Sequence, residues 1–205
     1  MVKKIKDLGK IRLVQLQPNG LIIETPSGSF YDESRRLVVD RLQISLKGIE
    51  STTTKGEQVL DIHHLDHPDK AYGDDDLVCI GFTSHYDAMR EQFGEHMVDG
   101  IAGENIIIEN DQEVWLEDLG RQIAIENGAT GEMTLLDVLS YAKPCEEFSH
   151  FVTKSQHKDL PAAKLKSTLQ FLNNGRRGFL LVLNEKQEKA TIQAGDRVFA
   201  IHEEE

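Results

Sequence analysis

Short runs of aliphatic and β-branched residues, separated by Gly, Pro, Asn and Asp, recur along the chain and predict a protein built mainly from strands. Runs at 11–16 and 21–24 flank Pro18-Asn19-Gly20 and predict a hairpin. The apolar run at 77–82 predicts a buried strand, which would make Cys79 a structural core residue. Further strands are expected at 37–46, 59–62, 106–108, 121–126, 179–183, 190–192 and 197–201.

Two stretches have the helical pattern instead. Thr83 or Ser84 is a suitable cap for a helix that runs to Phe93 and ends at Gly94. The second helix follows Pro161, a residue typical of the first turn. Its apolar residues recur at helical spacing, namely Ala162, Leu165, Leu169 and Leu172. The expected fold class is therefore α+β, mainly β with a few helices.

The strand that starts at Met133 leads to the most distinctive residue, Cys145, which directly follows Lys143-Pro144. A proline here predicts a helix that starts at Pro144, with Cys145 in its first turn. Free N–H groups and the helix dipole would then stabilise a thiolate, and Lys143 adds positive charge while Glu146 and Glu147 oppose it. The alternative is a small buried hydrophobe, because unpaired cysteines are commonly buried and inert.

The stretch DGIAGENIIIEN at 99–110 combines two glycines with a polar pair. Gly100 and Gly103 permit a tight backbone, and Glu104 and Asn105 stand where the loop meets the strand. Such a loop can direct backbone N–H groups and an amide side chain at an anion or an oxo group. It can equally be a tight turn into a buried strand, and spacing alone does not separate the two.

Two further groups of residues suggest ligand binding. Arg176 and Arg177, at a helix-to-strand junction, can clamp a phosphate or carboxylate, or be a solvated junction. His63, His64 and His67 lie within five residues and are of a type that zinc and iron accept. No HExxH pattern accompanies them, so a solvated loop, or a single ligand-facing His, is the alternative to a metal site.

Composition limits the class of partner. The 205 residues carry a net charge of -12 with a pI near 5.1, which argues against non-specific binding to nucleic acid or anionic membranes. Two cysteines are too few for a disulfide scaffold and favour a reducing, cytoplasmic setting. No apolar run approaches the roughly 20 residues of a membrane span, and no signal peptide is expected. No linker divides residues 1–205, so a single domain is expected.

Several motifs, in this order, resemble those of the MOSC domain, the module named for the C-terminal part of molybdenum cofactor sulfurases. GIAGENI at 100–106 resembles the family's G-x-x-G-E-N-hydrophobic motif, and KPC at 143–145 resembles its Pro-Cys motif. RGF and the following strand at 177–182, with AGDRV at 194–198, resemble its closing strand and turn. The match covers about 77–202, whereas the family's upstream G-D-x-H element is matched only loosely here.

The resemblance implies a compact MOSC-type β-barrel that stands alone and is linked to molybdenum-cofactor chemistry. Cys145 would carry sulfur as a persulfide or act as a molybdenum ligand. The residues that would bind the anionic molybdopterin, or another small anionic ligand, are Gly103, Glu104, Asn105, Arg176 and Arg177. Some stand-alone members support the reduction of N-hydroxylated compounds, which implies a cysteine desulfurase or reductase as partner.

Three hypotheses result. The first is a MOSC protein that acts through Cys145, as a sulfurtransferase or an oxidoreductase component. The second is a barrel that binds an anionic ligand without chemistry. The third is a metal-dependent hydrolase built on His63, His64 and His67.

Overall fold

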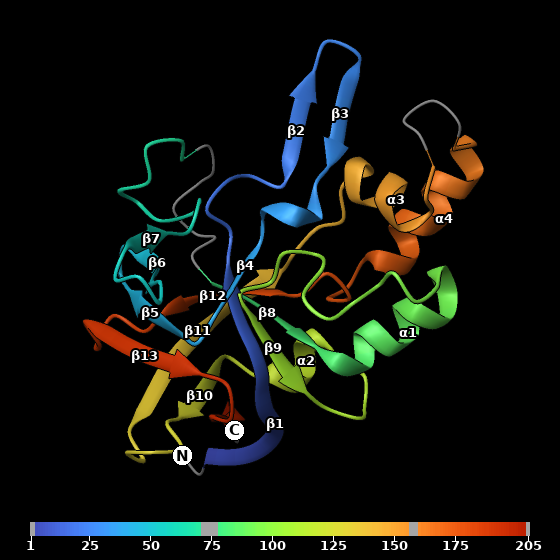
Figure 1. Cartoon of the computed structure of the whole chain (residues 1–205). Coiled ribbons are helices and arrows are strands. Elements are labelled where there is room, and N and C mark those ends of the chain that lie inside the picture. Colours follow the sequence, from blue (N-terminus) through green and yellow to red (C-terminus); the bar gives the residue numbers. More distant parts are fainter. Residues whose placement is uncertain (1–2, 71–77, 156–159, 204–205) are drawn as a thin grey trace.

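A closed barrel is the centre of the molecule (Figure 1). The computed structural model describes residues 3–70, 78–155 and 160–203. Seven strands follow one another in the order β14-β10-β11-β12-β8-β9-β1, and the barrel closes because β1 also pairs with β14. Their bounds are β1 (Lys3–Leu16), β8 (Val78–Phe82), β9 (Ile106–Glu109), β10 (Gln122–Glu126), β11 (Met133–Tyr141), β12 (Phe179–Leu183) and β14 (Arg197–Glu203). The predicted mainly β, α+β class is confirmed.

The remaining strands are appended to the barrel. β4 (Leu37–Val39) pairs with β1. A second sheet has the order β13-β5-β6-β7, formed by β5 (Arg41–Ser45), β6 (Gly48–Thr52), β7 (Gln58–Leu60) and β13 (Lys189–Gln193). A separate hairpin joins β2 (Ile22–Thr25) to β3 (Gly28–Tyr31), and a short 3-10 turn, Glu33–Arg35, follows it. The hairpin projects from the barrel beside α3 (Figure 1).

The predicted hairpin between residues 11–16 and 21–24 is wrong. β1 pairs with β14, β9 and β4, all distant in sequence, and β2 turns back on β3 around Pro26-Ser27. Leu8, Ile11, Val14 and Leu16 of β1 belong to the apolar cluster that fills the barrel, so this strand gains more from long-range pairing than from its neighbour in sequence.

Helices cover part of the outside of the barrel. They are α1 (Thr83–Phe93), α2 (Leu116–Leu119), α3 (Glu146–Val152) and α4 (Ala162–Leu172). The prediction of a helix that ends at Gly94 is confirmed, as is the helix after Pro161. The predicted cap of α1 is wrong: its N-cap is Phe82, without a side-chain cap, because the Thr83 and Ser84 hydroxyls donate to the Asn110 and Gln112 carbonyls instead. α1 connects β8 to β9, the parallel pair of the barrel.

Two apolar clusters hold these layers together. The first fills the barrel, and the second lies between the barrel and the helices. On β9, Ile106 and Ile108 belong to the first cluster and Ile107 to the second, as the two faces of a strand require. Tyr86 and Phe148 bring α1 and α3 into the second cluster, against which the site described next is built.

Candidate functional site

Cys145 lies at the entry to α3. β11 ends at Tyr141, and α3 begins at Glu146, so Cys145 is the N-cap residue rather than part of the first turn as predicted. It has an extended backbone, with φ -109° and ψ 165°. Its Sγ accepts a hydrogen bond from the Phe148 N–H at 3.5 Å, in the manner of an N-cap oxygen. Lys143 and Pro144 thus lie between the end of β11 and the start of α3, and the Cys145 thiol that follows them is half-buried.

The side chain of Arg177 meets that sulfur. Its Nη1 donates to Cys145 Sγ at 3.5 Å, and its Nη2 donates to the Ala102 carbonyl at 2.8 Å. The guanidinium stacks on the Phe148 ring, 4.5 Å from the ring centre. Burial by itself would lower the pKa of Arg177, but the negative groups that face it, Cys145 foremost, raise the pKa overall. The structure therefore holds a buried guanidinium within 3.5 Å of the Cys145 sulfur.

A cavity of about 250 Å³ opens in front of this pair. Residues from the whole length of the chain line it, namely Gln17, Leu21, Ile22, Tyr31, His63, Cys79, Ala102, Gly103, Asn105, Ala142, Lys143, Cys145, Arg177 and Leu180. Arg177 Nε is buried and has no hydrogen-bond partner among the described residues. The cavity thus combines a thiol with a cationic side chain that retains a donor.

Asn105 fixes one side of the cavity. Its Oδ1 accepts from the Cys79 N–H at 2.9 Å, and its Nδ2 donates to Asp61 Oδ2 at 3.0 Å. Asp61 is fully buried, and its Oδ1 lies 2.7 Å from His63 Nδ1. A chain of hydrogen bonds therefore runs from the Gly103-Glu104-Asn105 loop to His63 on the cavity wall. The polar atoms of Asn105 are engaged by the protein itself.

Glu104 lies behind the same loop and is fully buried. Its Oε2 accepts a hydrogen bond from the Tyr86 hydroxyl at 2.6 Å, and its Oε1 has no partner among the described residues. Burial raises the pKa of Glu104 to about 7, although the Tyr86 hydrogen bond and the charge of Arg177 oppose the rise. Gly178 leaves room for this side chain, since a Cβ there would lie 2.8 Å from it.

Arg176 is directed elsewhere. Its Nε and Nη2 donate to Glu113 Oε1 at 3.1 and 2.9 Å, and its guanidinium lies over the rings of Trp115 and Phe171. The structure thus brings Arg177, Gly103 and Asn105 to the cavity with Cys145, places Glu104 behind it, and leaves Arg176 outside it.

Cys79 differs from its prediction. It is half-buried on β8 and lines the cavity, so its description as a core residue is wrong. The reason is the alternation of the strand: Val78 and Ile80 face the barrel interior, which turns Cys79 outward.

The histidines do not gather. His63 contacts Asp61, His64 is buried, and His67 Nε2 lies 3.2 Å from the Pro18 carbonyl. Within the described parts of the chain, no group of three or more His, Cys, Asp or Glu side chains is placed to hold a metal ion. Sequence analysis missed the buried Asp61 that orients His63, because a single Asp has no local signature.

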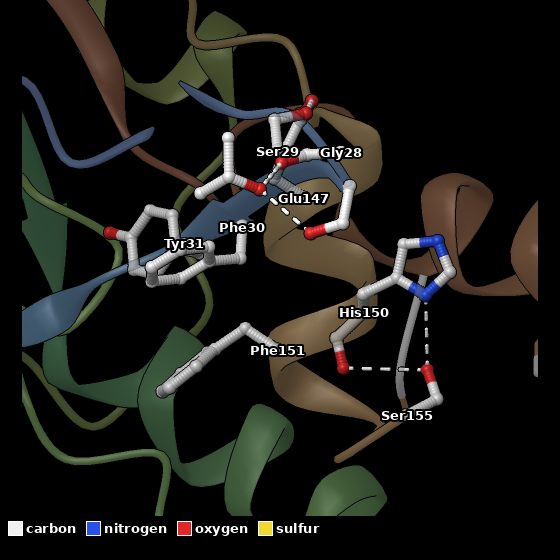
Figure 2. Close-up of a pocket in the computed structure, with 10 residues that line it drawn as sticks. Gly28, Ser29, Phe30, Tyr31, Glu147, His150, Phe151 and Ser155 are labelled. Carbon is white, nitrogen blue, oxygen red and sulfur yellow. Dashed lines mark hydrogen bonds between the residues drawn. The ribbon is translucent and has the colours of Figure 1, made fainter. Parts of the chain in front are cut away.

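Glu147 is turned away from the thiol. It accepts a hydrogen bond from Ser29 Oγ at 2.8 Å and lines a second cavity, of about 310 Å³, between the hairpin and α3 (Figure 2). Tyr31 packs edge-on against Phe148 at 5.0 Å and donates to the Ile101 carbonyl, so the hairpin is fixed to the helix that presents Cys145. Glu147 is thus bonded to the hairpin and is not among the residues that line the Cys145 cavity.

The chain belongs to the MOSC domain family: the family model matches residues 67–199, more than half of the chain. The fold is similar to that of the YUAD protein from Bacillus subtilis, with a TM-score of 0.62 and 13% identity over 99% of this chain and 100% of that one. It is also similar to YiiM from Escherichia coli, with a TM-score of 0.52 and 14% identity over 96% of this chain and 71% of that one. At these identities the likeness shows the fold alone.

No curated protein sequence matches the chain. Among the described residues, no helix combines the length and the apolar character that crossing a membrane requires.

Proposed function

We propose that this MOSC-domain protein acts in the cytoplasm through Cys145, which carries sulfur as a persulfide or binds the metal of a molybdenum cofactor. The observation that carries the proposal is the contact of Arg177 Nη1 with Cys145 Sγ beside an open cavity. A cation that faces a thiol favours the thiolate, the form that attacks sulfur and ligates metals.

The cavity favours a small reacting group. Its volume of about 250 Å³ lies below the roughly 300–1,000 Å³ of typical ligand pockets. It suits a terminal sulfur atom, or the metal end of a cofactor whose remainder lies outside. In the first case the Cys145 thiolate attacks the terminal sulfur of a donor persulfide and the donor thiolate leaves, so no external oxidant is needed.

The residues fit a molybdenum cofactor in two respects. The Cys145 thiol is a soft donor of the kind that suits such a metal, and the unpartnered Arg177 Nε suits an anionic group. A bound cofactor would supply two-electron redox chemistry. By family resemblance the reaction would be reduction of N-hydroxylated compounds, with a reductase or a cysteine desulfurase as partner.

The test uses the purified protein and a cysteine desulfurase with free cysteine. Peptide mass spectrometry should find one added sulfur atom on the Cys145 peptide, and molybdenum analysis of the same protein covers the cofactor branch. The Cys145→Ala variant should lose both signals while it remains folded, with at most the small loss of stability that removal of an N-cap acceptor brings. A wild-type protein that gains no sulfur and retains no molybdenum would contradict the proposal.

A barrel that binds an anion without chemistry is the second candidate. It is favoured by Arg177, whose buried Nε has no partner among the described residues and keeps a donor for an anion whether or not the thiol reacts. It predicts that molybdate or a pterin phosphate raises the unfolding temperature equally in the wild type and in Cys145→Ser. Loss of that stabilisation in the variant would exclude it.

A further inference from the structure

A groove next to the site has an apolar floor. α4 fully buries only Thr168 and Leu172, whereas Leu165 and Leu169 on the same stripe stay partly exposed. These two leucines line an open groove of about 560 Å³ between α4 and the segment before α3. The other apolar residues of its lining are Tyr141, Pro144 and Ala162.

The groove adjoins the Cys145 cavity. Lys143 lines both of them, and Pro144, the neighbour of Cys145, lines the groove. A segment that lies in the groove is therefore placed next to the cavity. Asn105 and Arg177, which line the cavity, and Asp61, which is bonded to Asn105, do not line the groove.

The charge of the groove is opposite to that of the whole protein. The chain has a net charge of -12, yet α4 contains no acidic residue and carries Lys164 and Lys166. Lys166 and Lys143 both line the groove and are exposed. In the described part of the chain, neither lysine forms an ion pair.

We infer that this groove is the docking site for an acidic, amphipathic segment of a partner protein that acts on Cys145. Leucine side chains of the partner would cover Leu165 and Leu169, and its carboxylates would pair with Lys143 and Lys166. A second copy of this chain would bring a further net charge of -12 to the interface, whereas a short acidic segment brings only a few charges to the two lysines, so the segment is the favoured occupant. The inference rests on the proposed function only in naming Cys145 as the residue that the partner reaches.

The probe is a fluorescent amphipathic peptide of roughly 15 residues, with leucines along one face and glutamates elsewhere, matched by a peptide with lysines in place of the glutamates. Fluorescence anisotropy should show the acidic peptide binding about tenfold more tightly than the basic one. Its affinity should fall as salt is added, because the lysines are exposed. Equal binding of both peptides, or no binding of either, would overturn the inference.

Two variants and a control locate the binding. Lys166→Glu should weaken binding of the acidic peptide about tenfold and strengthen that of the basic peptide. Leu169→Ser should weaken binding of both to a similar extent. Lys55→Glu carries the same charge change on an exposed loop and should leave both affinities unchanged. If Lys55→Glu has the same effect as Lys166→Glu, the attraction is general to the surface and the inference fails.

A second readout separates docking from reactivity. The acidic peptide is given a terminal activated disulfide, and its exchange with Cys145 is measured in the Cys79→Ser background against that of a small disulfide. Docking predicts a faster exchange for the peptide, and Lys166→Glu should abolish the advantage. A thiol inert to both reagents, with peptide binding intact, supports docking and counts against the proposed function. Self-association of the wild type that Leu169→Ser abolishes would identify a second copy as the occupant and overturn the inference.

Discussion

Two walls of the Cys145 cavity are built differently. In the loop wall, residues 102–105, Asn105 is hydrogen-bonded to the Cys79 backbone and to buried Asp61. In the thiol wall, Cys145 and Arg177, the sulfur contacts are 3.5 Å long and the Arg177 Nε has no partner among the described residues. Asn105 in the first wall has its bonding capacity filled, whereas Arg177 in the second wall retains a donor.

This difference predicts that the two walls contribute to different properties, one to the stability of the fold and the other to the reactivity of the site. Buried polar groups that are fully paired contribute to folding, and removing one partner leaves the other desolvated. Groups that retain a donor next to a cavity are available to a ligand. Changes in the loop wall should therefore act on the free energy of unfolding, and changes in the thiol wall should act on reactivity.

The largest effect is expected from Asn105→Ala. The substitution leaves the Cys79 N–H and one oxygen of buried Asp61 without this partner, which should lower the free energy of unfolding by about 4 kcal/mol. Urea denaturation measures the loss. The matched change Asn19→Ala, at an exposed turn, should cost under about 0.5 kcal/mol. Equal costs for the two would remove the distinction between the walls.

Glu104→Gln tests the pH dependence of the loop wall. The folded pKa of Glu104, about 7, lies above its ordinary value of 4.5, so the folded protein binds this proton more tightly than the unfolded chain does. The resulting stabilisation is complete below pH 4.5 and is lost as pH rises through 7. As the pH rises through this range, the free energy of unfolding of the wild type should fall by on the order of 3 kcal/mol relative to that of the variant. Urea titrations at several pH values check it, and parallel curves for the two proteins would contradict it.

Arg177→Met acts on the thiol wall. Without the guanidinium, negative charge on the Cys145 sulfur loses a partner at 3.5 Å, and alkylation of Cys145 at neutral pH should slow roughly tenfold. Peptide mass spectrometry after timed labelling gives the rate for Cys145 separately from Cys79. An unchanged rate would show that Arg177 does not stabilise the thiolate.

The smallest effect is expected from Arg176→Met. This side chain loses its ion pair with partly exposed Glu113 and its stacking on Trp115 and Phe171, at a cost of about 1 kcal/mol. The alkylation rate of Cys145 should not change. A slower rate here would mean that the two adjacent arginines share the site after all.

Local patterns determined much of this protein. The end of α1 at Gly94, the helix after Pro161 and the hairpin that leads to Cys145 follow from capping, turn and periodicity rules that act within a few residues. The motifs around Gly103 and Cys145 were sufficient to recognise the family that the family model then confirmed.

Only the tertiary structure decided which partners these elements have. Strand β1 pairs across the whole chain, and Arg176 and Arg177 separate to opposite surroundings although they are neighbours in sequence. Cys79 faces the cavity because its neighbours face the barrel. The physical reason is common to all three: a sequence pattern fixes the type of an element, whereas the direction of a side chain depends on which faces meet when the barrel closes.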